Sequence, residues 1–347
     1  MKTQKNPIRQ IRWAIVGLGA QAEKIAAALQ ISRNGTLMAS ASKDKAHAES
    51  FAKKHGAKVF FSDYKKMLKE REIDAVFVAS PNNLHKNQVL AALAAGKHVL
   101  CEKPLALSHA DSRAMVKRAQ ENKLILGTGF HLRFHPLLQE IRTLIHKKSI
   151  GELVLIDMHW SVGIPGATTR TPFEGHMRWR DNPKEAGGGA VMARGVHMFD
   201  LLRFLTRDEV TRVMAHTDAT SRTVDTFATG IFQMSRGAIA TLTTSRKIPY
   251  PKNELVIYGN KGRIVAHDAF TTNFSGTLEV TKGERTTKKT APQGNAYVKE
   301  IEDFGDAILT NKKPASSGGD GLRTVLITEA FVRSALLKRE IAVVKIT

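Results

Sequence analysis

The sequence predicts an α/β protein in which a doubly wound parallel sheet precedes an α+β domain built on a large, mostly antiparallel, open sheet. Short apolar runs alternate with helix-forming segments up to about residue 130, and a glycine-rich turn joins the first run to the first helix. After residue 130, long alternating segments rich in β-branched residues take over. The 347 residues suffice for two domains of about 100–200 residues each, which we place at 1–130 and 131–347.

The first domain is predicted to consist of repeated strand–helix units. Its apolar strands are expected at 12–18, 36–42, 74–80, 97–101 and 124–130. Its helices are expected at 20–32, 45–56, 82–96 and 108–123. Strands and helices that alternate at this spacing form right-handed βαβ units, so the sheet should be parallel.

The second domain opens with a helix at 136–147. Alternating strands follow at 152–162, 211–220, 226–234, 238–247, 254–259 and 263–268, with glycine turns between several of them. Helices near 196–206, 295–310 and 320–338 are expected to cover one face of this sheet, and the last of them is a candidate to pack back on the first domain. The other face has no visible cover, which predicts a homodimer or homotetramer through the C-terminal sheet.

The composition narrows the classes of partner. Lys and Arg number 53 against 32 acidic residues, a net charge of +21, but they are spread along the chain. The densest basic run, 281–290, holds no aromatic residue for base stacking, which argues against nucleic acid and favours a small anionic ligand. No apolar run is long enough for a membrane helix, and no secretory signal is visible. A single cysteine, Cys101, excludes an internal disulfide and fits a cytoplasmic protein.

The glycine-rich turn has the spacing Gly17-x-Gly19-x-x-Ala22 between a strand and a helix. In such a turn Gly17 permits the tight bend, Gly19 lets a pyrophosphate approach the backbone, and Ala22 allows the helix to pack closely on the strand. Free N–H groups at the helix N-terminus then face the phosphates. The pattern predicts a Rossmann dinucleotide-binding domain; the alternative is a glycine turn without a ligand.

The end of the second strand bears on the choice of dinucleotide. An NAD site usually places an acidic residue there, to bind the ribose hydroxyls. This chain has Ser42 and Lys43 instead, and Asp44 should point into the next turn. A hydroxyl and an ammonium suit a 2′-phosphate, so we predict NADP rather than NAD as the cofactor. The alternative is that Lys43 is an ordinary exposed lysine.

Lys103 is the first candidate for catalysis. It follows the strand 97–101 at the carboxyl edge of the sheet, where ligands of such folds bind. Pro104 forces the backbone of Lys103 to be extended. Burial and a neighbouring positive charge would lower its pKa and let it exchange a proton with a substrate hydroxyl.

A second constellation follows three glycines at 187–189. His197 and Asp200 lie at the start of an amphipathic helix, where a histidine is more often structural than catalytic. His131 and His135 should not share a helical face because Pro136 starts the next helix, so no metal site is predicted.

Six motifs, in order along nearly the whole chain, resemble the glucose-fructose oxidoreductase/inositol 2-dehydrogenase (Gfo/Idh/MocA) family of NAD(P)-dependent oxidoreductases. They are GLGAQA (17–22), SPNNLH (80–85), AGKHVLCEKPLAL (95–107), FHLRFHP (130–136), WRDNPKEAGGG (179–189) and GVHMFDLLRFL (195–205).

The resemblance implies roles for individual residues. The cofactor-binding candidates, joined to Ser42 and Lys43, are Gly17, Gly19, Ala20, Ser80, Asn82, His85, Glu102, Lys103, Arg133, Trp179 and Arg180. Pro104 is expected to be cis. Lys103 and His197 are expected to act around the reacting carbon, and one of the two transfers the alcohol proton. The substrate-binding candidates are Lys103, His131, Arg178, Arg194 and His197.

One departure from the family pattern concerns the substrate. The family has an Asp four residues before the histidine, where this chain has Ala193 followed by Arg194. A lost carboxylate and a gained guanidinium favour an anionic substrate, since guanidinium groups bind carboxylates and phosphates bidentately. The alternative is that Arg194 points to solvent.

The sequence thus predicts an NADP-dependent oxidoreductase. It would act on a secondary alcohol or carbonyl of a sugar, a cyclitol or a sugar-derived, anionic substrate. The alternative is a non-catalytic NADP-binding or regulatory protein on the same fold, since a fold does not fix a function.

Overall fold

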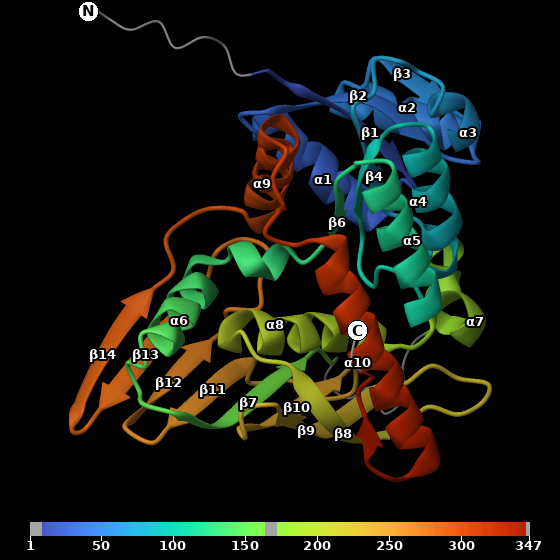
Figure 1. Cartoon of the computed structure of the whole chain (residues 1–347). Helices are drawn as coiled ribbons and strands as arrows, with labels where there is room; N and C mark the ends of the chain where they lie inside the picture. Colours follow the sequence, from blue (N-terminus) through green and yellow to red (C-terminus); the bar gives the residue numbers. More distant parts are fainter. Residues whose placement is uncertain (1–8, 164–171, 345–347) are drawn as a thin grey trace, which may run out of the picture.

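The computed structural model describes residues 9–163 and 172–344, and its elements form two layers of sheet with helices between and above them (Figure 1). The first domain holds a six-stranded sheet. Its strands are β1 (Ile11–Val16), β2 (Gly35–Ala41), β3 (Val59–Phe61), β4 (Ala75–Val78), β5 (His98–Cys101) and β6 (Leu126–Thr128). The order β3-β2-β1-β4-β5-β6, with every pair parallel, is that of a dinucleotide-binding Rossmann sheet and confirms the prediction.

Helices cover both faces of this sheet. They are α1 (Ala20–Ile31), α2 (Lys45–His55), the single turn α3 (Tyr64–Met67), α4 (His85–Ala94) and α5 (His109–Glu121). The ends of α2 follow local chemistry, because Asp44 accepts the N–H of His47 and Gly56 closes the helix at φ 73°. The sequence did not indicate β3 or α3, since a half-exposed strand of three residues carries no readable alternation.

The second domain is built on a nine-stranded sheet. Its strands are β7 (Leu153–Ser161), β8 (Val210–Thr217), β9 (Phe227–Met234), β10 (Ile239–Ser245), β11 (Glu254–Gly259), β12 (Gly262–His267), β13 (Thr277–Lys282), β14 (Arg285–Thr290) and β15 (Ile341–Ala342). Among the strands described, only β7 and β10 pair in parallel, so the prediction of a mostly antiparallel sheet is confirmed.

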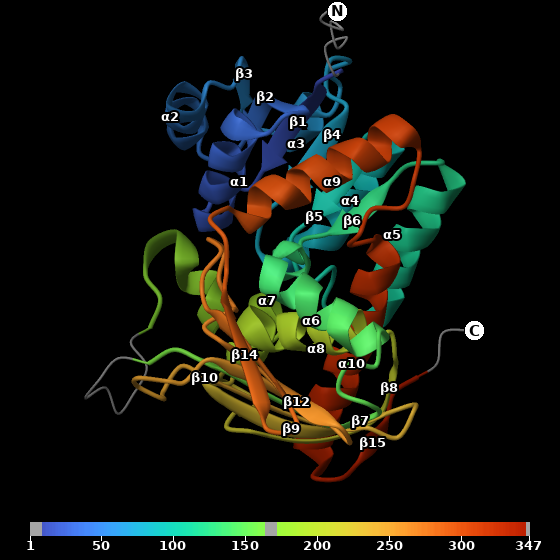
Figure 2. The ribbon, with the colours of Figure 1, turned by 90° about the vertical axis from the view of Figure 1, so that its left-hand side faces the viewer.

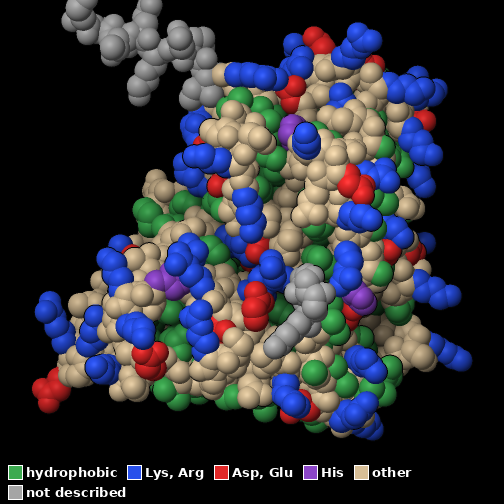
Figure 3. Space-filling view, viewed as in Figure 1, with side chains coloured by type: hydrophobic (Ala, Val, Ile, Leu, Met, Phe, Trp, Pro, Cys, Tyr) green, Lys and Arg blue, Asp and Glu red, His purple; other side chains and the backbone are tan. Residues whose placement is uncertain are grey.

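The basic run at 281–290 has a structural explanation. It forms much of the hairpin β13–β14, which the sequence analysis missed, and all six residues of the edge strand β14 are exposed. Charged side chains on an exposed edge strand hinder pairing with another sheet. Elsewhere, lysine and arginine side chains are scattered over the visible face rather than gathered in one stripe (Figure 3).

The inner face of the second sheet is covered by α6 (Pro136–His146), α8 (Val196–Thr206) and α10 (Gly318–Leu337) (Figures 1 and 2). Every residue of α8 is buried. Phe331 of α10 packs on Phe199 of α8 and Phe232 of β9, with ring centroids 5.3 and 5.9 Å apart. The other end of α10 lies against α5 and β6, so this helix joins the two domains.

The expectation that 295–310 also covers this sheet is wrong. This segment forms α9 (Ala296–Thr310), which packs on α1 of the first domain. Phe304 of α9 lies 5.4 Å from the Trp13 ring, between ring centroids, in the first domain's core. An amphipathic pattern shows that a helix has an apolar face but not which sheet receives that face.

No helix in the described part of the chain is long and apolar enough to cross a bilayer. The cytoplasmic location stays a prediction.

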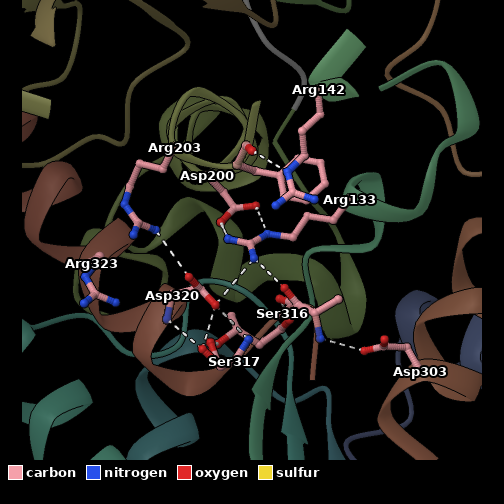
Figure 4. Close-up of polar contacts among 12 residues, drawn as sticks. Arg133, Arg142, Asp200, Arg203, Asp303, Ser316, Ser317, Asp320 and Arg323 are labelled. Atoms are coloured by element: carbon pink, nitrogen blue, oxygen red, sulfur yellow. Dashed lines mark hydrogen bonds and ion pairs between the residues drawn. The ribbon is translucent and has the colours of Figure 1, made fainter. Parts of the chain in front are cut away.

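A buried ion-pair network ties three segments together (Figure 4). Arg133, in the 3₁₀ turn η2 (His131–Phe134), donates to both carboxylate oxygens of Asp200 on α8, at 2.7 and 2.5 Å. Its Nη1 also donates to the carbonyl oxygen of Ala315, at 2.6 Å, and lies 3.4 Å from Asp320 at the start of α10. The Nε, Nη1 and Nη2 groups of Arg133 thus all donate to other parts of the protein.

The assignment of Arg133 to cofactor binding is therefore corrected. Its side chain is 5% exposed, and the pKa of its guanidinium is raised because the charges of Asp200 and Asp320 outweigh its burial. The FHLRFHP motif showed a positive charge near the site, but nothing in sequence paired that charge with an aspartate 67 positions away.

We expect Arg133→Leu to lower the free energy of unfolding by about 3–5 kcal/mol, because it leaves Asp200 buried without its partner. Urea unfolding measures this loss, and Arg113→Leu, at an exposed position on α5, is the matched control. Cofactor affinity in the folded variant should stay unchanged. Weaker cofactor binding with unaltered stability would return Arg133 to the cofactor site.

Candidate active site

The glycine turn sits between β1 and α1, as predicted. Gly17 has φ +84°, and a Cβ there would lie 2.5 Å from the Oγ of Ser80. A Cβ on Gly19 would meet nothing within 4 Å, which leaves open space beside the backbone. No side chain caps the N-terminus of α1, so the first N–H groups, beginning at the exposed Ala20, are available to an anion.

Lys103 connects the two domains at the carboxyl edge of the first sheet. It lies two residues beyond β5, and the Lys103–Pro104 peptide is cis. Its Nζ donates to the carbonyl oxygens of Ala193, at 2.8 Å, and Met192, at 3.2 Å. Both carbonyls belong to η4 (Val191–Gly195), one π-helical turn that leads into α8. A π-helical turn frees backbone groups from the ordinary helix pattern and is common at functional sites.

Asp225 holds the backbone around that turn in place. Its carboxylate accepts the N–H groups of Gly189, at 2.6 Å, and Val191, at 2.8 Å. A Cβ on Gly189 would lie 1.8 Å from the carbonyl oxygen of Asp225, so only glycine fits there. Sequence reasoning missed Asp225, because it lies in a loop far from the glycines it supports.

Burial, together with the charges around it, lowers the pKa of Lys103. Burial lowers the pKa of Lys103 to about 7; the Glu102 charge acts in the opposite sense, and nearby Arg180, Arg194 and Arg246 lower it further. The predicted fall in pKa therefore has burial as its main cause, with protein cations as the like charges. Burial also raises the pKa of Glu102, whose Oε1 has no hydrogen-bond partner within the described ranges.

Two buried histidines lie side by side next to the site. His197, on α8, contacts the ring of His131 edge-on at 4.9 Å between centroids, and Trp160 of β7 lies 5.7 Å away. Burial lowers the pKa of His131 to about 3 and that of His197 well below its usual value. Both rings are therefore neutral at pH 7, and the Nδ1 of each lacks a hydrogen-bond partner among the residues described.

A cavity of about 50 Å³ lies at the junction of the domains. Six predicted residues line it: Ser80, Asn82, Glu102, Lys103, Trp179 and Arg180. Trp179 and Arg180 come from the 3₁₀ segment η3 (Gly175–Asp181), with the guanidinium 5.0 Å from the Trp179 ring. The other eight lining residues were not among the predicted site residues: Gln21, Ala79, Ala186, Gly188, Gly189, Met192, Ala193 and Arg246. The glycines at 187–189 had been noted only as the segment that precedes His197.

His85 does not line this cavity but lies behind the residues that do. Its ring is fully buried, with Nδ1 2.8 Å from the carbonyl oxygen of Pro104 and Nε2 3.0 Å from that of Ser80. The ring thus holds together the two strand exits that carry Ser80 and Lys103. Asn82 bridges the domains instead, since its Nδ2 donates to the carbonyl oxygen of Ala186 at 2.8 Å.

The arginines predicted to bind substrate take other positions. Arg194 donates to the Oγ1 of Thr244, at 3.2 Å, and to the carbonyl oxygen of Ser245, at 2.9 Å, at the end of β10. It therefore points neither to solvent nor into the cavity. Arg178 is exposed and does not line the cavity. Arg246, which follows β10, takes the place in the cavity that Arg194 was expected to hold.

At the end of β2, the side chains of Ser42, Lys43 and Asp44 lie as their order in the sequence predicts. Lys43 is exposed, and the Oγ of Ser42 accepts the N–H of Asp44 at 3.3 Å. The Asp44 carboxylate is turned toward α2, where it accepts the N–H of His47 at 3.0 Å. A cation and a hydroxyl thus follow this strand, and the nearby carboxylate is engaged as a helix cap.

These features fit a dinucleotide. The turn leaves room at Gly19, the N-terminus of α1 is uncapped, and Lys103 and an unpartnered Glu102 oxygen lie at the neighbouring strand exit. When bound, the nicotinamide supplies or accepts the hydride. The protein residues that would hold it are the glycine turn, Ser80, Asn82 and Glu102.

Comparisons with known proteins agree with this geometry. The chain is 26% identical over 328 residues to 1,5-anhydro-D-fructose reductase of Ensifer adhaerens, covering 93% of this chain and 96% of that protein. It is 28% identical over 299 residues to D-xylose 1-dehydrogenase (NADP(+)) 2 of Haloferax volcanii, covering 85% and 88%. The aldose-aldose oxidoreductase of Caulobacter crescentus, solved with glycerol, superposes with a TM-score of 0.87 at 25% identity, covering 96% of this chain and 100% of that one.

Two family models match consecutive parts of the chain. Residues 11–130 match the oxidoreductase family with an NAD-binding Rossmann fold, and residues 138–265 match the GFO/IDH/MocA C-terminal domain. The chain therefore belongs to the GFO/IDH/MocA family of oxidoreductases and acts on CH–OH groups with a nicotinamide dinucleotide.

Proposed function

We propose that the protein is an NADP-dependent oxidoreductase that interconverts a secondary alcohol and a carbonyl on an anionic, sugar-derived substrate. One observation carries the proposal: the Lys103 amine, with its pKa lowered to about 7, lies in a cavity at the domain junction beside the dinucleotide turn. The relatives named as sugar reductase and sugar dehydrogenase support the substrate class.

Lys103 is the better of the two candidates for proton transfer. A general acid–base works best when its pKa lies near the operating pH, and the pKa of Lys103 is lowered to about 7. Burial pushes the pKa of His197 far below that, so its ring stays neutral and cannot donate as an imidazolium. We therefore assign the alcohol proton to Lys103 Nζ and assign His197 to holding the substrate hydroxyl.

The backbone around Lys103 sets its direction. The carbonyl oxygens of Met192 and Ala193 orient two of its three N–H bonds, so the third position or the lone pair remains for substrate. During oxidation the neutral amine accepts the hydroxyl proton; during reduction the ammonium donates it. The surrounding buried residues keep water from competing for this proton.

We expect Lys103→Ala to lower turnover by about 10²–10⁴-fold with NADP affinity retained, because it removes the group that transfers the proton.

Because the neutral amine is the base, wild-type alcohol oxidation should rise with pH through about 7, and carbonyl reduction should fall over the same range. Stopped-flow absorbance of NADPH across pH 5–9 measures both, with dinucleotide fluorescence as the binding control. Undiminished turnover would remove Lys103 from the mechanism, and NADP binding without turnover on any sugar, cyclitol or sugar acid would favour the non-catalytic alternative.

The preference for NADP rests on Ser42 and Lys43 at the end of β2. We expect Lys43→Ala to reduce the ratio of kcat/KM for NADP to that for NAD by about 10- to 150-fold, the worth of one charge-assisted hydrogen bond. Lys58→Ala, an exposed lysine just before β3, is the control. A wild-type enzyme that prefers NAD would overturn this assignment.

An anionic substrate is supported by the charge of the cavity. Lys103, Arg180 and Arg246 line it, and Glu102 is the one acidic residue among the lining residues described. The family's Asp is Ala193 here, which supplies a backbone carbonyl to Lys103 and no charge. A carboxylate or phosphate on the substrate would balance these cations.

We expect wild-type kcat/KM to be higher for sugar acids or sugar phosphates than for their neutral parents. Arg246→Ala should lower kcat/KM for the anionic substrate by about 10- to 150-fold and leave the neutral parent nearly unchanged, because only the anion uses the charge. Arg246→Lys, which keeps the charge, should lose less. Equal losses on both substrates would show that Arg246 only supports the loop at Gly189, whose carbonyl oxygen it contacts at 3.4 Å.

We also propose that the outer face of the second sheet pairs two subunits. Large apolar side chains alternate outward along its strands and stay exposed: Val154, Ile231, Ile239 and Tyr258. Between them, the hydroxyls of Thr229 on β9 and Thr243 on β10 share a hydrogen bond of 2.9 Å, so these polar groups have each other as partners. An exposed apolar sheet face of this kind favours self-association.

A further inference from the structure

Basic side chains gather at the C-terminal end of α8, at the opposite end of the helix from His197. A cavity of about 330 Å³ opens there between α6, α8 and the loop before α10. Six of its lining residues are charged: Arg133, Arg142, Arg203, Arg207, Lys313 and Asp320. The cavity shares no lining residue with the active-site cavity, and the oxidoreductase mechanism uses none of these side chains.

Two of the five cations are neutralised by carboxylates. Arg133 is paired with Asp200, and Arg203 donates to both oxygens of Glu209, at 2.6 and 2.8 Å. Asp320, the single acid in the wall, is shared between them at 3.4 and 3.6 Å. These contacts account for the negative charge around the cavity.

The other three cations have no carboxylate partner in the described ranges: Arg142, Arg207 and Lys313. In addition, Arg203 has a side chain that is 8% exposed, and its Nη1 has no hydrogen-bond partner among the described residues. Burial, then the charges of Arg207 and Arg133, lower the pKa of Arg142. Arg142 and Arg207 therefore repel each other across a cavity whose single lining carboxylate, Asp320, is engaged by Arg133 and Arg203.

Stabilisation of the helix end does not account for this excess. The C-terminus of a helix carries about half a negative charge, which one nearby cation satisfies. Arg142 already does so, because its Nε donates to the carbonyl oxygen of Phe204 at 3.0 Å. Arg207 and Lys313 add two further charges at the cavity wall, beyond what the helix end needs.

We propose that this cavity is a binding site for a phosphate group, separate from the active site. Guanidinium groups match phosphate oxygens bidentately, and two arginines with a lysine carry enough positive charge to neutralise a dianion. A volume of about 330 Å³ exceeds the needs of inorganic phosphate and falls in the range of small-ligand sites. A phosphorylated small metabolite therefore fits the site better than the free ion, and the two share the same chemistry.

The test titrates the full-length protein, saturated with NADP, with inorganic phosphate and with glucose 6-phosphate by isothermal titration calorimetry. Ionic strength is held constant with chloride, so that general screening does not contribute. We expect inorganic phosphate to bind at one site per chain, and glucose 6-phosphate to bind this site in addition to any binding in the active site. The double variant Arg142→Ala/Arg207→Ala should weaken binding at least about 10-fold, the lower bound for one lost charge-assisted hydrogen bond.

Two further variants keep the result interpretable. Lys313→Ala removes a cavity cation that has no carboxylate partner in the described structure. This variant should also weaken phosphate binding, and it tests the proposal even when the double variant does not fold. Arg246→Ala, in the active-site cavity, should leave the affinity of phosphate for the α8 cavity unchanged. This control separates an error in the proposed substrate class from an error in the proposed phosphate site. Tighter binding of glucose 6-phosphate identifies a metabolite site, and equal affinity identifies a phosphate site. No saturable binding, or binding that both cavity variants retain, would overturn the proposal.

Discussion

The hydrogen bonds from Lys103 Nζ to the carbonyl oxygens of Met192 and Ala193 are the contact on which the site depends. They join an exit from the first sheet to the turn that starts α8 in the second domain. Each side has its own support, since His85 contacts the carbonyl oxygen of Pro104 and Asp225 fixes the glycine loop. A proton-transferring group needs placement within a fraction of an ångström, and backbone anchors on both sides supply it.

The same contact puts a lysine where its charge is disfavoured. Burial and three arginines lower the pKa of Lys103 to about 7, and Glu102 resists the change. Near neutral pH, both the neutral amine, which can accept a proton, and the ammonium, which can donate one, are then populated. In the proposed function, one residue can therefore serve either direction of the reaction without a partner acid.

The sequence was sufficient for the fold class because local patterns determined it. Strand–helix alternation and the turn at Gly17 specified a Rossmann sheet, and they also placed Lys103 at its carboxyl edge. Long-range pairings could not be read in this way. Arg133 meets Asp200, and Arg194 meets Thr244 rather than the cavity, through contacts that no spacing reveals. Arg246 was missed because nothing local distinguishes one arginine after a strand from another.

This geometry explains how alanine at position 193, in place of the family's Asp, affects Lys103. A carboxylate at this position, beside the Lys103 amine, would favour the ammonium and raise its pKa. With alanine, the lysine is held by an uncharged carbonyl oxygen, and its pKa remains about 7. The loss of the family's Asp therefore does not remove the proton-transfer group; it leaves the cavity cations unbalanced. In the proposed function, the charge that balances them comes with the substrate, so the departure from the family pattern changes specificity and leaves the proposed proton-transfer group in place.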